Sequence, residues 1–244
     1  MSNLQVLDAS DNNLSGLIPE CQVKLASLSV LNLKGNRYDQ MPSTFTFAYN
    51  NLPSLNINGN RLKGKLSRSL ANCKMLEILD LGNNMISDTF QFLLEKLPSL
   101  KILILRNNMF YGQVEIPKTK FVLPSLRIID LSSNNFTGKL STYFLQSLSA
   151  MAMGEEHKLL SSLIGKYDSY YHDSVTIMNK GYEMVLVKIL TIFVALDLSN
   201  NKFHGNVPKE IGELKSLIVL NLSRNAFICN TVISMVQSTL HLQH

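Results

Sequence analysis

Apolar residues recur along this chain in a pattern that fits neither one long amphipathic helix nor a simple alternation. The stretch Leu126–Leu140, LRIIDLSSNNFTGKL, shows it in full: apolar residues stand at positions one, four, six, eleven and fifteen, asparagine at nine and glycine at thirteen. The same pattern returns on both sides of this stretch. An internal repeat of this kind predicts a stack of similar units rather than an ordinary globular core.

Each fixed position has a physical role. Ile129 and Leu131 form a short strand whose side chains point into the body, whereas Asp130 points away from it. Asn134 follows where the chain turns away from the strand. A buried amide at this point is expected to bond the backbone groups that the turn leaves unpaired, in its own repeat and in the next.

Asparagine occupies this position in eight copies of the pattern, with intervals of 24 residues up to the fifth copy, then 26, 67 and 24. They are Asn12, Asn36, Asn60, Asn84, Asn108, Asn134, Asn201 and Asn225. The pattern resembles the leucine-rich repeat. The resemblance implies an α/β solenoid, a right-handed superhelix shaped like a horseshoe, with a parallel β-sheet on its concave face.

The spacing divides the chain into four segments. Residues 1–148 hold repeats one to six, and residues 193–227 hold repeats seven and eight, the last incomplete. Residues 149–192 lack the pattern, but their aromatic and β-branched content predicts strands and turns, so we expect an island inserted in the solenoid. Residues 228–244 form a divergent tail.

Composition narrows the function. The net charge of +5 is spread along 244 residues without a basic stripe, which argues against nucleic-acid binding. The scattered Cys21, Cys73 and Cys229 predict no disulfide framework and no metal site, and His241 and His244 alone are a weak metal pair. No catalytic or phosphate-binding motif is present, so we expect neither enzymatic activity nor a cofactor.

Targeting signals are not evident. The chain opens directly in a repeat, with no apolar segment of the signal-peptide kind. The best membrane candidate, Met184–Leu198, is too short and contains Lys188 and Asp197. We therefore expect no membrane segment in this chain.

A narrower resemblance comes from the outer half of the repeats and from the island. The segments NNLSGLIPE and NKFHGNVPKEIGELKSL carry a G-x-I/V-P variant that is similar to the plant extracellular class of leucine-rich repeats. The island sequence YYHDSVT, followed by NKG and then by an LDLSNN repeat, resembles plant receptor-like proteins of the disease-resistance kind. Members of that family are kinase-less ectodomains with an island and one membrane helix.

This resemblance implies recognition of an extracellular peptide or protein signal, in defence or development, with signalling through a partner receptor kinase at the plasma membrane. The matching island positions, which are candidates for ligand or co-receptor contact, are Tyr171, Asp173, Lys180, Gly181, Glu183 and Lys188. The structural alternatives are that Tyr171 fills the island core and that Gly181 only allows a turn.

The strand residues that point away from the core are mostly small and polar, which suits a peptide or protein held by hydrogen bonds on an exposed concave face. The alternative is that they only keep the sheet solvated. Lys34, Ile104 and Arg106 depart most from the repeat and are further ligand candidates. Glycosylation sequons occur at Asn13, Asn135 and Asn221, and they matter only in a secreted protein.

The family's secretion signal, cysteine-bearing cap and membrane helix are not found, so the chain reads as an internal piece of a receptor. Two other functions stay open. One is a soluble inhibitor of a microbial wall-degrading enzyme, although such inhibitors generally lack an island. The other is a remnant without function, because the apolar ends of a cut solenoid favour aggregation.

Overall fold

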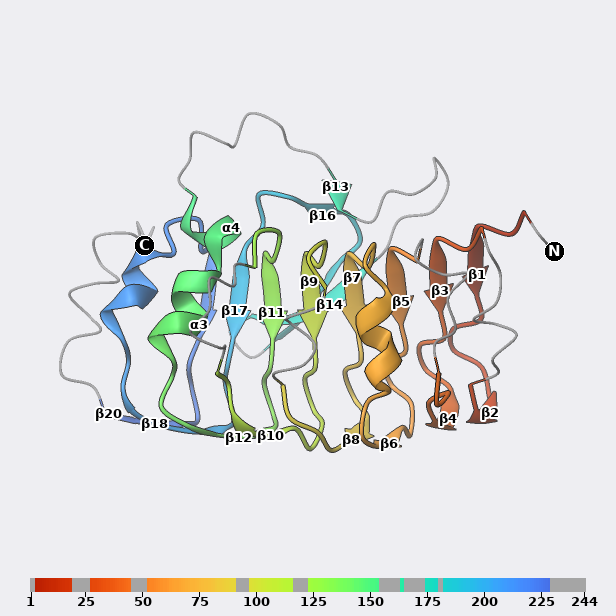
Figure 1. Ribbon diagram of the computed structural model, residues 1–244, viewed down its shortest axis with the longest axis horizontal. Helices are drawn as coiled ribbons and strands as arrows, with labels where there is room; N and C mark the ends of the chain where they lie inside the picture. The colour runs from red at the N-terminus through yellow and green to blue at the C-terminus, as the bar shows by residue number, and fades with distance from the viewer. Residues whose placement is uncertain are drawn as a thin grey trace.

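The computed structural model describes residues 3–18, 27–44, 52–90, 97–115, 123–153, 163–164, 174–179 and 182–228, with the backbone alone for residues 178, 179, 182 and 183. The described chain is a solenoid of stacked turns, each contributing one strand to a long parallel sheet (Figure 1). The expected fold class is confirmed.

The main sheet has eight parallel strands, one for each repeat. In pairing order they are β1 (Val6–Asp8), β3 (Val30–Asn32), β5 (Ser54–Asn56), β7 (Ile78–Asp80), β9 (Ile102–Ile104), β11 (Ile128–Asp130), β17 (Ala195–Asp197) and β19 (Val219–Asn221). Ile129 on β11 lies opposite Leu196 on β17, so the sheet continues across the inserted segment without a gap.

A second row of short parallel strands follows the asparagine turns. It comprises β2 (Ser15–Leu17) with β4 (Arg37–Gln40), β6 (Lys63–Gly64) with β8 (Met85–Ile86), and the four strands β10 (Tyr111–Gln113), β12 (Asn135–Gly138), β18 (Lys202–Asn206) and β20 (Ala226–Ile228). Gly138 in this row has a φ of 86°, a conformation that favours glycine over other residues.

Short helices cover the outer side of the described turns. They are η1 (Arg68–Asn72), α3 (Thr142–Ser147), α4 (Ser149–Ala152) and η3 (Lys209–Glu213). Met151 in α4 is fully buried in the leucine core, and its carbonyl accepts a hydrogen bond from the Ser216 amide at 2.9 Å. The first residues after 148 therefore extend the outer side of the solenoid.

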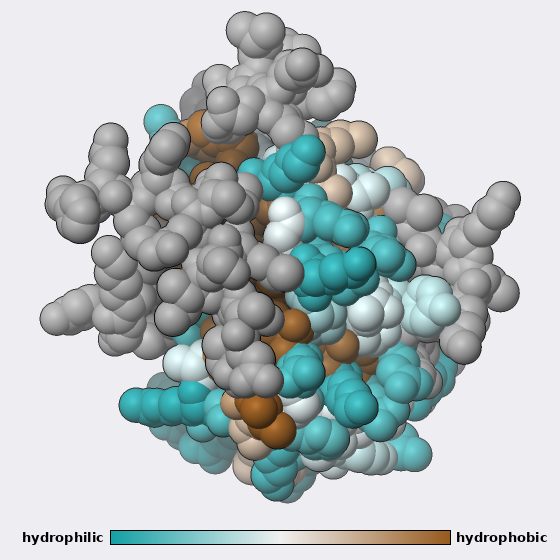
Figure 2. Space-filling model, turned by 90° about the vertical axis from the view of Figure 1, so that its left-hand side faces the viewer, coloured by the Kyte–Doolittle hydropathy of each residue, from teal (hydrophilic) through white to brown (hydrophobic). Residues whose placement is uncertain are grey.

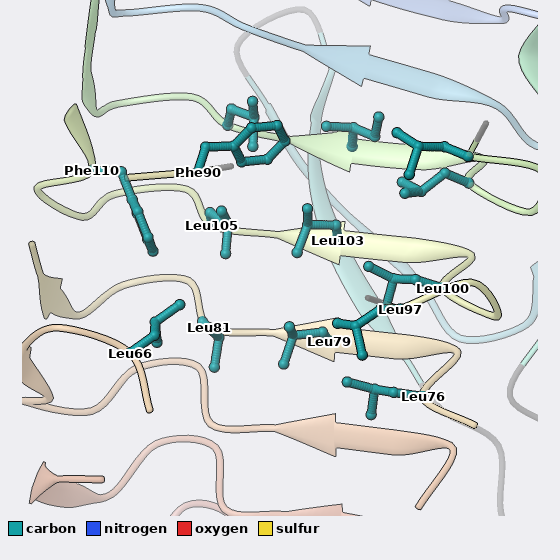
Figure 3. Close-up of a cluster of buried hydrophobic side chains, with 14 of the residues drawn as sticks. Leu66, Leu76, Leu79, Leu81, Phe90, Leu97, Leu100, Leu103, Leu105 and Phe110 are labelled. Atoms are coloured by element: carbon teal, nitrogen blue, oxygen red, sulfur yellow. The ribbon is translucent and has the colours of Figure 1, made fainter. Parts of the chain in front are cut away.

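Stacked leucines form the solenoid core (Figure 3). Leu79, Leu81, Leu103 and Leu105 are fully buried, and each packs against its equivalents in neighbouring turns. Burial of each such side chain stabilises the fold by roughly 1.5–3 kcal/mol. Because the contacts lie between turns, no turn is stable alone.

A row of phenylalanines runs beside the leucines in the later turns. The rings of Phe110, Phe136, Phe203 and Phe227 stack in sequence, with centroids 6.1–6.2 Å apart. Phe90 meets Phe136 edge to face at 6.0 Å. These rings fill the space under the second row of strands.

The asparagine ladder is present at all eight positions. The Asn134 amide donates to the carbonyl of Leu105 at 3.0 Å and to that of Leu131 at 3.1 Å, and its Oδ1 accepts from the Phe110 amide at 3.0 Å. Leu105 and Phe110 belong to the preceding repeat, so Asn134 bonds the preceding repeat and not the next one, which the sequence had suggested. The same holds from Asn36 onward, whereas the bonds of Asn12 within the described chain are to its own repeat.

The asparagine bonds are the same on the two sides of the inserted segment. Asn201 donates to the Leu131 carbonyl at 2.9 Å and accepts from the Phe136 amide at 3.1 Å, although 70 and 65 residues separate these partners. Repeats six and seven are therefore adjacent turns of one solenoid.

Burial declines at the last described turn. Leu217, Leu220 and Leu222 are only partly buried, and Ile218 is 50% and Ile228 62% exposed. Figure 2 looks onto this end of the solenoid and shows apolar side chains among hydrophilic ones. No helix in the described ranges is both long and apolar enough to cross a membrane.

Candidate ligand-binding face and its island cover

The candidate site is the concave face, by which we mean the face of the main sheet that points away from the leucine core. Alternation along each strand places two residues per repeat on this face, such as Ile128 and Asp130 of β11, while Ile129 between them enters the core. The site is therefore a regular array with one strand per repeat.

The island lies on this face. Its described strands are β14 (Val175–Asn179), which pairs antiparallel with β15 (Tyr182–Leu186), and β13 (Leu163–Ile164), which pairs antiparallel with β16 (Ile189–Leu190). In Figure 1, β14 lies behind the main sheet, on the side opposite to η1 and α3. Strands and turns were expected across residues 149–192; the described part of this segment contains these four strands, but it begins with the helix α4 at Ser149–Ala152.

An apolar cluster joins the island to the sheet. The island contributes Ile164, Val175, Ile177 and Ile189, with Met184 and Leu186 packed beside them, and the sheet contributes Ile78, Ile102, Ile104, Ile128 and Ala195. All five sheet residues are less than 5% exposed. The cluster therefore buries the middle of the concave face, which the sequence had led us to expect as an exposed polar surface.

Polar groups of the concave face in these repeats are buried as well. Asp80 is 3%, Asp130 2% and Asp197 5% exposed. In the first repeat, Asp8 at the equivalent position is exposed to solvent. The concave face thus has a covered middle and an open N-terminal part, by which we mean the exposed Asp8 and the half-buried Asn32 and Lys34; Val30 and Ser54 beside them are already buried.

Most of these carboxylates are held by local hydrogen bonds. Oδ1 of Asp130 accepts from the backbone amide of Ser132 at 2.9 Å and from its hydroxyl at 2.6 Å. Oδ1 of Asp197 accepts from the amide of Ser199 at 2.9 Å, and its Oδ2 accepts from Asn221 at 3.0 Å. The serine two residues after Asp130 and after Asp197 therefore fixes the orientation of each carboxylate, and the Gly82 amide does so for Asp80.

Burial changes the acidity of two of these groups. Burial raises the pKa of Asp130 to about 7, and the nearby Asp197 carboxylate adds to this rise, whereas Ser132 and Arg106 oppose it. Burial also raises the pKa of Asp80, against the hydrogen bonds from Gly82 and Asn58. Loss of hydration disfavours the charged form in both cases.

The structure places the sequence-derived candidates in different environments. Lys34 is half-buried beside the open part of the concave face. Ile104 is fully buried in the cluster beneath the island, and Arg106 is only 7% exposed. The expected surface role of Ile104 is thus replaced by a contact between solenoid and island.

The island candidates are less completely described. Lys188 is exposed in the turn between β15 and β16, and Glu183 lies in β15, where the backbone alone is described. Tyr171, Asp173, Lys180 and Gly181 lie outside the described residues. Their roles in ligand contact stay predictions.

The glycosylation candidates also differ. Asn13 and Asn135 are exposed. Asn221 is engaged on both sides of its amide, because its Nδ2 donates to Asp197 and its Oδ1 accepts from the Ser223 hydroxyl at 2.8 Å. A glycan on Asn221 would disrupt this pair of contacts.

Sequence reasoning missed the apolar column that receives the island. In three strands an isoleucine comes directly before the residue that points into the core, so these strands are nearly continuous apolar runs. The isoleucines are Ile78, Ile102 and Ile128. A parallel strand with such a run is typically buried on both faces. That signal could have shown which repeats are covered.

Comparison with known proteins supports the repeat assignment. The family model described as Leucine Rich Repeat matches residues 3–25, 125–147 and 194–214. These ranges contain Asn12, Asn134 and Asn201 of the ladder. The family match and the eight-stranded parallel sheet both indicate a leucine-rich repeat solenoid.

Similar proteins come from Arabidopsis thaliana. Receptor-like protein 32 is 44% identical over 221 residues, which is 89% of this chain and 25% of that protein. Receptor-like protein 35 is 45% identical over 225 residues, or 90% of this chain and 23% of that protein. The chain therefore spans about a quarter of the length of these relatives.

Solved structures give the same fold. The ectodomain of the Arabidopsis receptor kinase HAESA, in complex with an extended IDA peptide hormone, has a TM-score of 0.61 and 26% identity, covering 92% of this chain and 30% of its own. A Leptospira interrogans leucine-rich repeat protein has a TM-score of 0.66 and 25% identity, covering 99% and 48%. Repeats, sheet and sequence similarity together show that this chain is a leucine-rich repeat solenoid, and that it is similar to about a quarter of the length of plant receptor-like proteins.

Proposed function

We propose that this chain is the ligand-recognition part of a plant cell-surface receptor-like protein, which binds an extracellular peptide or protein signal and couples to a receptor kinase partner. The observation that carries the proposal is the division of the concave face into an open N-terminal part and a part covered by the island. A ligand that lies along the open part meets the island at its edge. Both surfaces then contribute to recognition.

The open part suits an extended polypeptide. Asp8 and Asn32 form a hydrogen-bonded row, in which the Asn32 amide donates to Asp8 at 2.9 Å, and Lys34 adds one positive charge beside it. Such groups can bond the main chain of a peptide, and a cation can select an acidic side chain or a terminal carboxylate. We therefore expect an acidic or C-terminal group of the ligand at Lys34.

The comparisons support this reading. HAESA is similar over most of this chain, and its ectodomain structure holds a peptide hormone. The relatives named receptor-like proteins support a place at the outer side of the plasma membrane. Both points concern those proteins, and for this chain they are part of the proposal.

The test is a binding screen with the purified chain. The probes are synthetic plant signalling peptides and purified secreted microbial proteins, measured by biolayer interferometry. We expect at least one probe to bind, with an affinity that falls about tenfold or more in Lys34→Glu, equivalent to about 1.4 kcal/mol. Lys63→Glu is the matched control, because Lys63 is exposed on β6 in the second row of strands.

Two outcomes would contradict the proposal. One is the absence of any binding partner in the screen. The other is a partner whose affinity changes equally in Lys34→Glu and Lys63→Glu, since this would place the contact away from the open concave part. Inhibition of a microbial wall-degrading enzyme by the purified chain would favour the inhibitor function instead.

A further inference from the structure

Asp130 differs from the other carboxylates at its position in the repeat. The others each accept a hydrogen bond from an asparagine of a neighbouring repeat: Asn32 bonds Asp8 at 2.9 Å, Asn58 bonds Asp80 at 2.9 Å, and Asn221 bonds Asp197 at 3.0 Å. Within the described part of the chain, Oδ2 of Asp130 is buried and has no hydrogen-bond partner. An unpaired carboxylate oxygen in this position costs free energy when it is charged.

The apolar cluster between island and sheet lies directly beside Asp130, because Ile104, the register partner of Asp130 on β9, belongs to it. Asp130 follows Ile128 on the same face of β11, and Ile128 belongs to the apolar cluster with Ile177 and Ile189 of the island. Asp8 occupies the equivalent position in the first repeat and is exposed. Asp130 would regain water if the island moved off the sheet.

The charges around Asp130 come from the sheet. Asp197 lies opposite Asp130 in the register of β11 and β17, and its negative charge adds to the effect of burial in raising the pKa of Asp130. Arg106 acts in the opposite direction. The described island residues in the cluster are Ile164, Val175, Ile177, Met184, Leu186 and Ile189. All six are apolar, so they supply no charge that would compensate the carboxylate.

From this geometry we propose that protonation of Asp130 latches the island onto the concave face, so that the covered part of this face opens as the medium changes from acidic to neutral. The latch does not require the receptor function, because it depends only on contacts within the chain. If the chain is a receptor, the latch would make the length of concave face offered to a ligand depend on extracellular pH.

The sign follows from linkage. Asp130 has a pKa of about 7 with the island closed, whereas a solvated aspartate has an ordinary pKa of about 3.9. The closed state therefore binds the proton more tightly, and closure is most favourable below the lower value. As the pH rises towards the higher value, the equilibrium constant for closure falls by up to about tenfold per pH unit.

Amide hydrogen exchange of the 244-residue chain tests the latch. Protection of the hairpin amides in Val175–Asn179 and Tyr182–Leu186 is measured from pH 5 to pH 8, with correction for the intrinsic exchange rate. We expect hairpin protection to fall by about tenfold or more over this range, while protection in Val30–Asn32, away from the described island contacts, stays constant. Hairpin protection that is constant across the range would overturn the proposal.

Three variants assign the effect to Asp130. Asp130→Asn, which cannot ionise, should abolish the pH dependence of hairpin protection. Asp8→Asn is the matched control at the exposed equivalent position and should behave like the wild type. Asp197→Asn removes the neighbouring charge and should shift the transition to lower pH. A wild-type pH dependence in Asp130→Asn would contradict the latch.

A direct titration of Asp130 in the wild-type protein tests the latch even if the Asp130→Asn variant does not fold. The carboxyl carbon shift of Asp130 in the wild-type protein is followed by NMR against pH. A midpoint near 7 supports the proposal. A midpoint below about 5, close to that of an ordinary aspartate, would overturn it.

Discussion

Asp8 and Asp130 occupy the same position in two copies of one repeat, yet their surroundings are opposite. Asp8 lies in solvent and is bonded by Asn32 of the next turn. Asp130 is 2% exposed and has a pKa raised to about 7 by burial. The repeat thus fixes where a side chain points, whereas the place of the repeat in the stack and the island cluster beside it set whether that side chain is exposed or buried.

The apolar column beside these aspartates shows the same contrast. Val6 in β1 is half-buried, whereas Ile128 in β11 is fully buried in the island cluster. We expect Ile128→Ala to destabilise the closed island by about 2–5 kcal/mol, because it leaves a cavity in a packed interface. Val6→Ala should cost about 1 kcal/mol or less. The free energy of unfolding is measured by urea denaturation, and the stability of the closed island by hydrogen exchange of β14. Equal losses in the two variants would show that Ile128 does not pack more tightly than Val6.

A second test concerns the ladder, which should not depend on the island. Asn134 bonds backbone groups of two repeats from a buried position, whereas Asn12 is exposed and bonds only the carbonyls of Ala9 and Ser10 in its own repeat. Asn134→Ala should lower the free energy of unfolding by roughly 2–3 kcal/mol, since several buried groups lose their partner. Asn12→Ala should cost about 0.5 kcal/mol. The free energy of unfolding of both variants is measured by urea denaturation. A larger loss in Asn12→Ala than in Asn134→Ala would contradict the role of buried asparagines in joining adjacent repeats.

The smallest expected effect concerns the edge of the covered region. Asn221 bonds Asp197 and Ser223, whereas Asn13 is exposed. Asn221→Ala should destabilise the protein by about 1 kcal/mol. Asn13→Ala should leave the free energy of unfolding within about 0.5 kcal/mol of the wild type. Thermal unfolding of both variants provides the measurement, and indistinguishable midpoints would argue against a structural role for Asn221.

Much of this architecture could be predicted from the sequence, because the rules behind it are local and repeated. Asn36 and Asn84 make the same bonds to their own and the preceding turn, so one correct interpretation of the pattern applies to every copy. The insertion was visible as a break in the period, but its first residues, Ser149–Ala152, form a helix of the solenoid instead. Its hairpin strands were predicted from β-branched residues such as Val175 and Ile177.

The docking of the island could not be predicted in the same way. No period relates Ile177 to Ile128, and their contact depends on how far the inserted chain folds back over the sheet. Polar residues such as Asp130 and Ser132 look like surface residues in the repeat pattern, yet they are buried here. Long-range covering of one element by another is set by tertiary packing, which local rules do not contain.

The central claim, that the island covers the middle of the concave face, can be tested with two residues of one type. Ile128 is fully buried beneath the island, and Ile218 is 50% exposed in the last described turn. Hydroxyl-radical footprinting at pH 5, where the island is expected to be closed, compares the oxidation rates of these two side chains. We expect Ile128 to react at least about tenfold more slowly than Ile218, because closure excludes water from the cluster. Equal rates would show that the island does not rest on the sheet and would contradict the account.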